Sequence, residues 1–386
     1  MQAIAPRKKP PRLKRKWLVL AVVFCAAAAT YTPAVNLILA VRLLIAIKGV
    51  ADGKTGEDLN VVQTRVSRTN GPAEEEALVY RPAGATPTRA VVLVPGISEL
   101  GCYHPRLTAL SRYLAANGFL VVTPDIKLLR MFRMSPGTVD LISFWFRQVP
   151  TLDSGSRVRV VGLSGISFSA TLAILAAARQ EVRDHVSFVF GIGAYDDPVR
   201  CSQAWFAAGP VTMSPGYYPT RYYARWIVML GALDLVSDKE EREFLERALT
   251  DLLSLKPAPP PPQDLSQASQ RWYRLALMPE DQSDDGLARA IESHLKSTLY
   301  KAISPEPAAA SIRCPVFLVH GAQDDLILPE ESLSLARRFV NAPVHLLVTP
   351  FLTHTHPARQ EPQGKGKLRA VAEIAGFFYD FAKVVR

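Results

Sequence analysis

The sequence predicts an α/β fold in which a mostly parallel sheet is covered by helices on both faces. From about residue 60 onward, short apolar runs with the composition of buried strands alternate with segments of helical pattern. The stretch 157–180, RVRVVGLSGISFSATLAILAAARQ, shows the pattern most sharply, as a β-branched strand, a Gly- and Ser-rich turn and an Ala-rich helix. At 386 residues and 48% hydrophobic content, the chain can bury the core of one domain with an insertion, or of two domains.

The first sixteen residues carry most of the net charge. The formal net charge of the chain is +10, and residues 1–16 hold seven Lys and Arg residues and no acidic residue, which leaves +3 for the rest. A basic tail can bind nucleic acid, but a membrane accounts for both this tail and the apolar segment that follows it. We therefore expect a cytoplasmic tail at residues 1–16 and no nucleic-acid partner.

Residues 17–36 are the predicted transmembrane anchor. They are uncharged, and twenty residues is about the length that a helix needs to span a bilayer. A cleaved signal peptide is the alternative, with a cleavage site at Ala26-Ala27-Ala28, but the apolar character continues past that site. The basic tail then places the rest of the chain in the periplasm or outside the cell. Residues 37–59 are an amphipathic juxtamembrane segment, expected along the interface or packed on the domain.

Eight segments have the composition of strands. The first two are separated by a turn at Asn70-Gly71-Pro72, and most of the later ones are continuous apolar runs. The predicted strands lie at residues 61–67, 77–81, 90–94, 119–123, from 158, 186–192, 315–319 and 344–348, and the helices between them at 107–117, 138–149 and 169–180. The core is thus expected in two parts, residues 60–200 and 308–386.

Residues 201–307 break this alternation and form a predicted helical insertion between the sixth and seventh strands. It contains an aromatic-rich stretch, a capping box that opens at Ser237, a proline-rich connector at 257–262, and helices at 269–278 and 284–302. Insertions at the functional face of a rigid scaffold usually contribute to binding, so we expect a lid or pocket wall. The alternative is that the insertion only fills surface and its aromatic residues pack its helices.

The turn after the fifth strand contains two candidate nucleophiles, Ser164 and Ser167. A serine on a tight strand-to-helix turn is exposed at the edge of a parallel sheet, and the turn needs small residues two places on either side because the two backbones nearly touch. Ser167 has Gly165 and Ser169 at these places, whereas Ser164 is followed there by the β-branched Ile166. We predict Ser167 as the nucleophile and keep Ser164 as the alternative. The purely structural explanation is a serine that caps a core helix.

Two carboxylates follow the seventh strand. Asp324 and Asp325 come three and four residues after Gly321. A carboxylate just past a buried strand can fix the tautomer of a histidine and stabilise its imidazolium. We predict Asp324 in this role by its spacing from the glycine, with Asp325 as the alternative, while one of the two could cap the next helix.

The predicted general base is His354, in the loop after the last strand, and His356 is the alternative. A loop histidine without partners would be a solvated surface residue. Here it completes a serine, aspartate and histidine that each follow their own strand, which favours nucleophilic catalysis. The expected oxyanion hole consists of the backbone N–H groups of Ile97 and Phe168. The four cysteines and seven histidines have no metal-ligand spacing, so we expect neither a metal nor a cofactor.

Over roughly residues 60–386 the chain resembles the α/β-hydrolase superfamily. The motifs that carry the resemblance are VVLVPGI, GISFSA, LVHGAQDDLILPEES and TPFLTHTHP. Two positions depart from the family pattern, because Ser169 stands where glycine is usual and Pro95-Gly96 replaces a more usual His-Gly. The resemblance implies an α/β-hydrolase fold and hydrolysis of an ester or related acyl compound by a triad of Ser167, Asp324 and His354.

The predicted function is that of a membrane-anchored serine hydrolase for a carboxylic ester. The anchor and the aromatic insertion suggest an apolar acyl group, by location only, so the expected substrate is a small-molecule or lipid-like ester. A peptidase or acyltransferase on the same triad is the enzymatic alternative, and a non-catalytic binding protein on the same fold is the other. The sequence leaves open the substrate, the cleavage of the N-terminal segment and the oligomeric state.

Overall fold

An eight-stranded sheet organises the part of the chain that the structure describes. This structure is a computed structural model and describes residues 15–152, 157–207, 220–278, 282–352 and 364–386, with side chains from Tyr31 onward in the first helix. The strands are β1 (Val61–Asn70), β2 (Ala73–Pro82), β3 (Arg89–Val94), β4 (Phe119–Pro124), β5 (Val160–Ile166), β6 (Phe188–Ile192), β7 (Val316–Gly321) and β8 (Val344–Thr349). All eight predicted strands are therefore confirmed.

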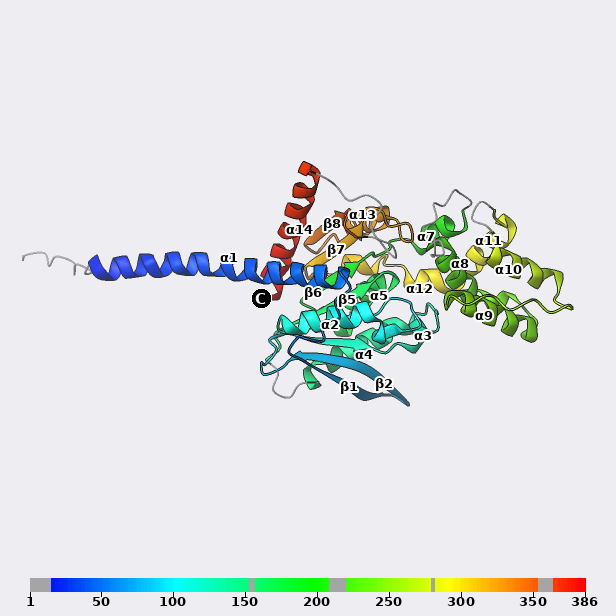
Figure 1. The fold of residues 1–386 in the computed structure, drawn as a ribbon, viewed down its shortest axis with the longest axis horizontal. Coiled ribbons are helices and arrows are strands. Elements are labelled where there is room, and N and C mark those ends of the chain that lie inside the picture. Colours follow the sequence, from blue (N-terminus) through cyan, green and yellow to red (C-terminus); the bar gives the residue numbers. More distant parts are fainter. Residues whose placement is uncertain (1–14, 153–156, 208–219, 279–281, 353–363) are drawn as a thin grey trace, which may run out of the picture.

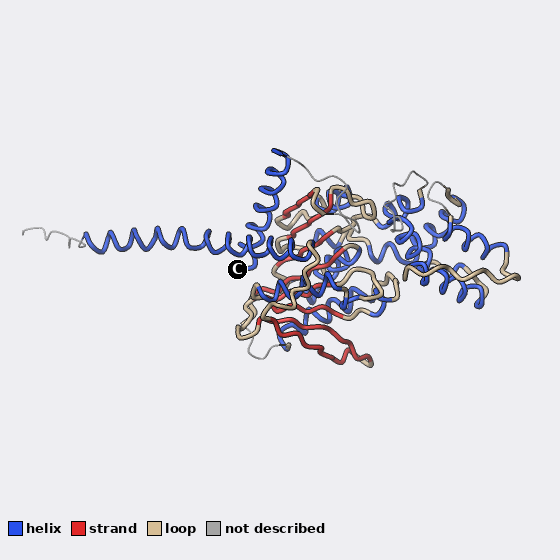
Figure 2. Tube along the Cα trace, in the orientation of Figure 1, coloured by secondary structure: helices blue, strands red, loops and turns tan. Residues whose placement is uncertain are grey.

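The sheet is mixed at one edge and parallel elsewhere. Its strand order is β1-β2-β4-β3-β5-β6-β7-β8 (Figures 1 and 2). β1 and β2 form an antiparallel hairpin, and β2 pairs antiparallel with β4. Every other neighbouring pair is parallel. The carboxyl ends of β3, β5, β6, β7 and β8 therefore share one edge of the sheet, where residues that follow these strands can meet.

Helices cover both faces, as predicted. One face packs against α2 (Pro105–Ala116), α14 (Gly364–Val385) and the second half of α1 (Arg15–Ala51), and the other against α4 (Gly137–Gln148), α5 (Phe168–Ala177) and α13 (Pro329–Ala336). Two short helices, α3 (Lys127–Arg130) and α6 (Gln180–Arg183), complete this part. In β3, Val91 and Leu93 pack in the buried cluster on the face of α1, α2 and α14, and Val92 and Val94 pack in the cluster on the opposite face. Burial on both faces is why this strand is apolar throughout.

The segment between β6 and β7 is helical, as predicted. Its helices are α7 (Pro198–Phe206), α8 (Thr220–Gly231), α9 (Lys239–Leu253), α10 (Gln267–Leu277), α11 (Asp285–Leu295) and α12 (Lys301–Ile303). Figure 1 shows α8 to α11 grouped at the end of the molecule opposite the free part of α1. The cap of α9 is Asp238, whose side chain accepts a hydrogen bond from the Glu241 N–H, so the cap predicted at Ser237 is wrong by one residue.

The first helix continues well beyond the predicted anchor. α1 runs unbroken from Arg15 to Ala51 with Pro33 inside it, so no break separates residues 17–36 from the segment 37–59. It is the one helix in the described ranges that is long and apolar enough to cross a membrane, judged by length and composition alone. Among its described side chains the apolar span is Tyr31–Ala51, one third of which is buried in the domain. Leu39 and Leu43 belong to the buried cluster formed with α2 and α14.

Candidate active site

Ser167 occupies a strained turn between β5 and α5. Its backbone has φ 59° and ψ −134°, and φ is positive at only three non-glycine residues of the described chain. A β-carbon at Gly165 would lie 2.2 Å from the carbonyl oxygen of Ser169, so only glycine fits where the strand and the helix meet. The Ser167 N–H donates to the carbonyl of Ile192 at the end of β6, at 2.7 Å. These features explain why the chain turns sharply at Ser167. Ser167 is partly exposed at this turn.

The alternative nucleophile, Ser164, lies in the middle of the sheet. It is part of β5 and pairs with Leu93 of β3 on one side and with Phe190 of β6 on the other. Its side chain is buried. A serine in this position cannot reach the edge of the sheet, which favours Ser167.

Asp324 lies in the loop after β7 with its carboxylate fixed by the backbone. One oxygen, Oδ1, accepts hydrogen bonds from the N–H groups of Leu326 and Ile327, both at 3.0 Å. The side chain is buried, whereas Asp325 is partly exposed. The two backbone bonds resemble a helix or turn cap, the structural role that was considered for one of the two carboxylates. They also hold Asp324 in one orientation, as a group that orients a histidine requires.

His354 and His356, the two candidates for the general base, lie outside the described residues. In the sequence they come after β8, which ends at Thr349 and pairs with β7.

His320, at the end of β7, is fully buried and has a structural position. Its Nε2 lies 2.7 Å from the carbonyl oxygen of Ile327 and 3.5 Å from Oδ2 of Asp324. Its Nδ1 lies 2.6 Å from the hydroxyl of Ser332 in α13. His320 therefore ties the Asp324 loop to the sheet and to the next helix.

The two residues expected to form the oxyanion hole lie after neighbouring strands. Phe168 is the first residue of α5, so its N–H points out of the positive end of the helix. Ile97 follows β3, the strand next to β5. The carbonyl of Ile97 accepts a hydrogen bond from the hydroxyl of Tyr223 in α8, at 3.0 Å. Burial raises the pKa of Tyr223, so the hydroxyl keeps its proton and remains a donor.

Tyr223 connects the helical insertion to this loop, and the sequence did not single it out in this role. Its ring packs edge-on against Phe132, with ring centres 6.1 Å apart. Phe132 is buried and has a φ of 58°. Next to it, Arg133 donates to the carbonyl of Leu230 and pairs with Glu246 of α9. Phe132 and Arg133, two consecutive residues of the core, therefore both contact the insertion. These contacts hold α8 against the Ile97 loop.

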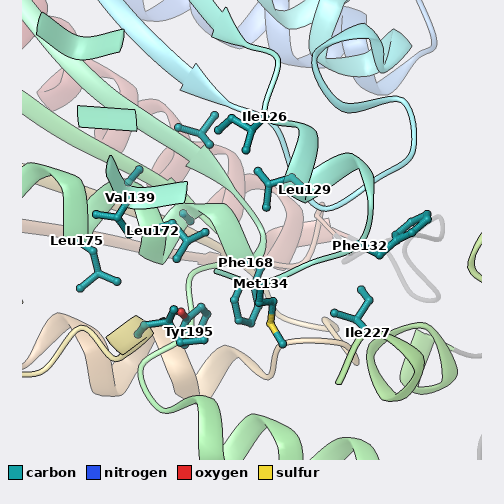
Figure 3. Packing of buried hydrophobic residues seen from close by; sticks show 14 of the residues in the cluster. Ile126, Leu129, Phe132, Met134, Val139, Phe168, Leu172, Leu175, Tyr195 and Ile227 are labelled. Atoms are coloured by element: carbon teal, nitrogen blue, oxygen red, sulfur yellow. Dashed lines mark hydrogen bonds between the residues drawn. The ribbon is translucent and has the colours of Figure 1, made fainter. Parts of the chain in front are cut away.

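The side chains on the insertion side of the Ser167 turn between β5 and α5, which we call the elbow, are apolar. The ring of Phe168 packs against the ring of Tyr195 at a tilt of 30°, with ring centres 4.4 Å apart. Figure 3 shows Phe168 beside Met134, with Ile227 of α8 close to them, and all belong to one buried cluster. The residue after the candidate nucleophile thus lies among aromatic and aliphatic groups from both the core and the insertion.

A buried ionic network holds α13 at the same edge of the sheet. Oε2 of Glu331 accepts hydrogen bonds from the N–H groups of Asp196 and Asp197, both at 2.9 Å, and its other oxygen pairs with Arg200. The carboxylate of Asp196 pairs with Arg338. The sequence does not reveal this network, because nothing in the order of these residues marks them as partners.

No protein-family model matches the chain, and no curated protein matches it. Similar solved structures include the acylaminoacyl peptidase of Pyrococcus horikoshii, a 2,6-dihydroxy-pseudo-oxynicotine hydrolase, and brefeldin A esterase, a bacterial homologue of human hormone sensitive lipase.

The identities to these three structures are 12%, 12% and 17%, and the TM-scores are 0.49, 0.46 and 0.45. The matches cover 85%, 84% and 89% of this chain, and 42%, 68% and 86% of the other chains, so this chain spans less than half of the peptidase.

The strand order and the elbow decide the fold. An antiparallel first hairpin leads into a parallel sheet, and the fifth strand passes through a strained Gly-x-Ser turn into a buried helix. The chain has the α/β-hydrolase fold. In this fold the candidate residues follow β5, β7 and β8 in the order serine, aspartate, histidine.

Proposed function

We propose that this protein is a membrane-anchored serine hydrolase. The observation that carries the proposal is the backbone of Ser167, which has a positive φ on a turn where only glycine fits at position 165. A core helix can be capped by a serine without such strain, so a cap alone does not account for it.

In the proposed reaction, the hydroxyl oxygen of Ser167 attacks the carbonyl carbon of the substrate and passes its proton to His354. The N–H groups of Ile97 and Phe168 bind the oxyanion of the tetrahedral intermediate. His354 then gives the proton to the leaving alcohol, which leaves an acyl group on Ser167. Water, deprotonated by His354, attacks this acyl-enzyme, and the carboxylic acid leaves as Ser167 regains its proton. Asp324 holds the imidazole in the required tautomer.

We infer a carboxylic ester with an apolar acyl group as the substrate class. Support comes from the apolar surroundings of the Ser167 turn, where the uncharged side chains of Phe168, Met134 and Ile227 are buried in one cluster. An amide or peptide, or transfer of the acyl group to an alcohol or amine, would use the same triad. A panel of matched esters, amides and nucleophilic acceptors separates these reactions by their relative rates.

The proposed anchor is the first part of α1. Its length and apolar composition, and the basic residues 1–16 before it, support a single span at residues 17–36 with the basic tail in the cytoplasm. The hydrolase domain would then lie in the periplasm or outside the cell.

Labelling with a fluorophosphonate probe tests the proposed nucleophile. Wild-type protein in membranes is compared with Ser167→Ala and Ser164→Ala, and circular dichroism confirms that each variant is folded. We expect labelling of the wild type and of Ser164→Ala, and none of Ser167→Ala. Loss of labelling only in Ser164→Ala would move the nucleophile into β5. A folded wild type that does not label would favour a binding protein on this fold.

A further inference from the structure

The domain is attached to α1 without a linker. Leu39, Ala40 and Leu43 of α1 are buried in one cluster with Phe377 and Phe381 of α14. Because the helix is unbroken, a rigid connection joins its free part to the domain. The orientation of the domain relative to any bilayer that α1 crosses is therefore fixed by this packing.

The register along α1 places the domain at the bilayer surface. At a rise of 1.5 Å per residue, a span of about 30 Å that begins at Trp17 ends near Asn36. The domain already reaches α1 before that point. The guanidinium of Arg386, just after α14, donates to the carbonyl of Thr32 at 3.3 Å and lies 5.8 Å from the ring centre of Tyr31. The end of α14 therefore overlaps the last part of the proposed span.

Exposed apolar and basic side chains lie on α1 just beyond residue 36 and on the first half of α14. Three apolar side chains of α1 just beyond residue 36 are about half exposed, namely Leu37, Ile38 and Val41. On the first half of α14, Leu368 is 72% exposed and Val371 is 49% exposed. Lys365, Lys367 and Arg369 are exposed on the same turns. Figure 1 shows α14 running across α1 where α1 leaves the domain.

We propose that these residues form a base surface, made of Leu37, Ile38 and Val41 of α1 and residues 364–371 of α14, that lies against an anionic phospholipid bilayer. Apolar side chains at the headgroup boundary and basic side chains beside them are what such a bilayer binds. The inference rests on the proposed anchoring by α1 and not on the proposed catalysis.

The base surface determines where the candidate site faces. The insertion lies at the end of the molecule opposite the free part of α1 (Figure 1), and Tyr223 of its helix α8 contacts the Ile97 loop of the candidate site. With the base surface on the bilayer, the catalytic edge faces the aqueous phase, and the substrate reaches it from there. A lipid embedded in the same membrane is then not the substrate, and the anchor gives no reason to expect one.

Photo-crosslinking in vesicles tests the base surface. The full-length protein is reconstituted in phosphatidylethanolamine and phosphatidylglycerol vesicles that contain a phosphatidylglycerol with a diazirine near its headgroup, and adducts are mapped by mass spectrometry. We expect adducts on residues 364–371 and 37–41, and none on residues 239–253 of α9. Adducts confined to residues before 31, in protein that resists alkaline extraction, would overturn the base surface and leave the anchor intact. Release of the protein by alkaline extraction would overturn both.

A charge variant sharpens this test. Lys365→Glu combined with Lys367→Glu should lower the adduct yield on residues 364–371 several-fold in these anionic vesicles. The matched control is Lys239→Glu combined with Lys256→Glu, two exposed lysines of the insertion, and should leave the yield unchanged. An equal yield from both variants would contradict a role for the basic residues. Hydrolysis of a soluble ester serves as a separate readout, which neither variant should change.

Discussion

At the α1 end of the molecule, helices are joined by ordinary apolar packing, whereas at the opposite edge the backbone itself is constrained. α1 and α14 meet through aliphatic and aromatic side chains, and Gly376 of α14 has open space around it. At the other edge, Ser167 has a positive φ and Gly165 has no room for a β-carbon. The contact between α1 and α14 thus needs only hydrophobic side chains of suitable size, while the candidate site needs particular residues at particular positions.

Gly165→Ala is the change with the largest expected effect. A methyl group 2.2 Å from the Ser169 carbonyl oxygen must displace backbone, so we expect a loss of more than about 2 kcal/mol of folding free energy and loss of probe labelling. The matched control is Gly376→Ala in the interior of α14, which should be neutral or stabilise by up to about 1 kcal/mol. Thermal unfolding of the two variants measures the difference. Equal melting temperatures would contradict the proposed contrast between the two ends.

Asp324→Asn should lower kcat for ester hydrolysis by about 10²- to 10⁴-fold. An asparagine keeps an oxygen for the N–H groups of Leu326 and Ile327, but its amide cannot stabilise an imidazolium. The control is Asp325→Asn, which should change kcat less than about 3-fold. Steady-state kinetics with a chromogenic ester measures both. The reverse ranking would assign the acidic residue of the triad to Asp325.

Tyr223→Phe should lower kcat by about 3- to 10-fold with little change in KM, since it removes one neutral hydrogen bond to the Ile97 carbonyl. Tyr222→Phe is the matched control, because the hydroxyl of Tyr222 donates to the carbonyl of Met278, within the same helical segment. A smaller effect for Tyr223→Phe than for Tyr222→Phe would show that the insertion does not position the Ile97 loop.

The features that the sequence could predict are those encoded by neighbouring residues. Strands buried on both faces appear as continuous apolar runs, which is why β3 and β7 were found. The elbow was found because its spatial constraint falls on Gly165, only two residues from Ser167.

Features that depend on contacts distant in sequence could not be predicted in the same way. Tyr223 and Ile97 are 126 residues apart, and Asp196 and Glu331 are 135 apart. The sequence places Tyr223 in an aromatic-rich stretch of a predicted lid or pocket wall, but it does not identify Ile97 as the residue that Tyr223 contacts. The predicted anchor ends at Asn36, whereas α1 continues to Ala51. Composition marks a run of membrane length, but it does not show that the helix continues beyond that run.

The smallest expected effect concerns the interior of the insertion. Hydrogen bonds from Ser269 and Ser266 lower the pKa of the partly exposed Glu241, which joins α9 to the start of α10. A carboxyl with a lowered folded-state pKa stabilises the fold above its unfolded pKa, and this contribution disappears as the pH falls through the lowered value.

Glu241→Gln should therefore speed amide hydrogen exchange at the first turn of α10 at pH 7. At acidic pH, Glu241 is protonated, and the exchange rates of the variant and the wild type should become equal. The rates are first corrected for the intrinsic effect of pH on amide exchange. Glu240→Gln, one residue earlier in α9, is the control. The same measurement should show no change at the base surface or at β5, because this junction lies within the insertion. A change that spread to β5 would mean that the insertion and the catalytic edge unfold as one unit, which would weaken the contrast between the two ends of the molecule.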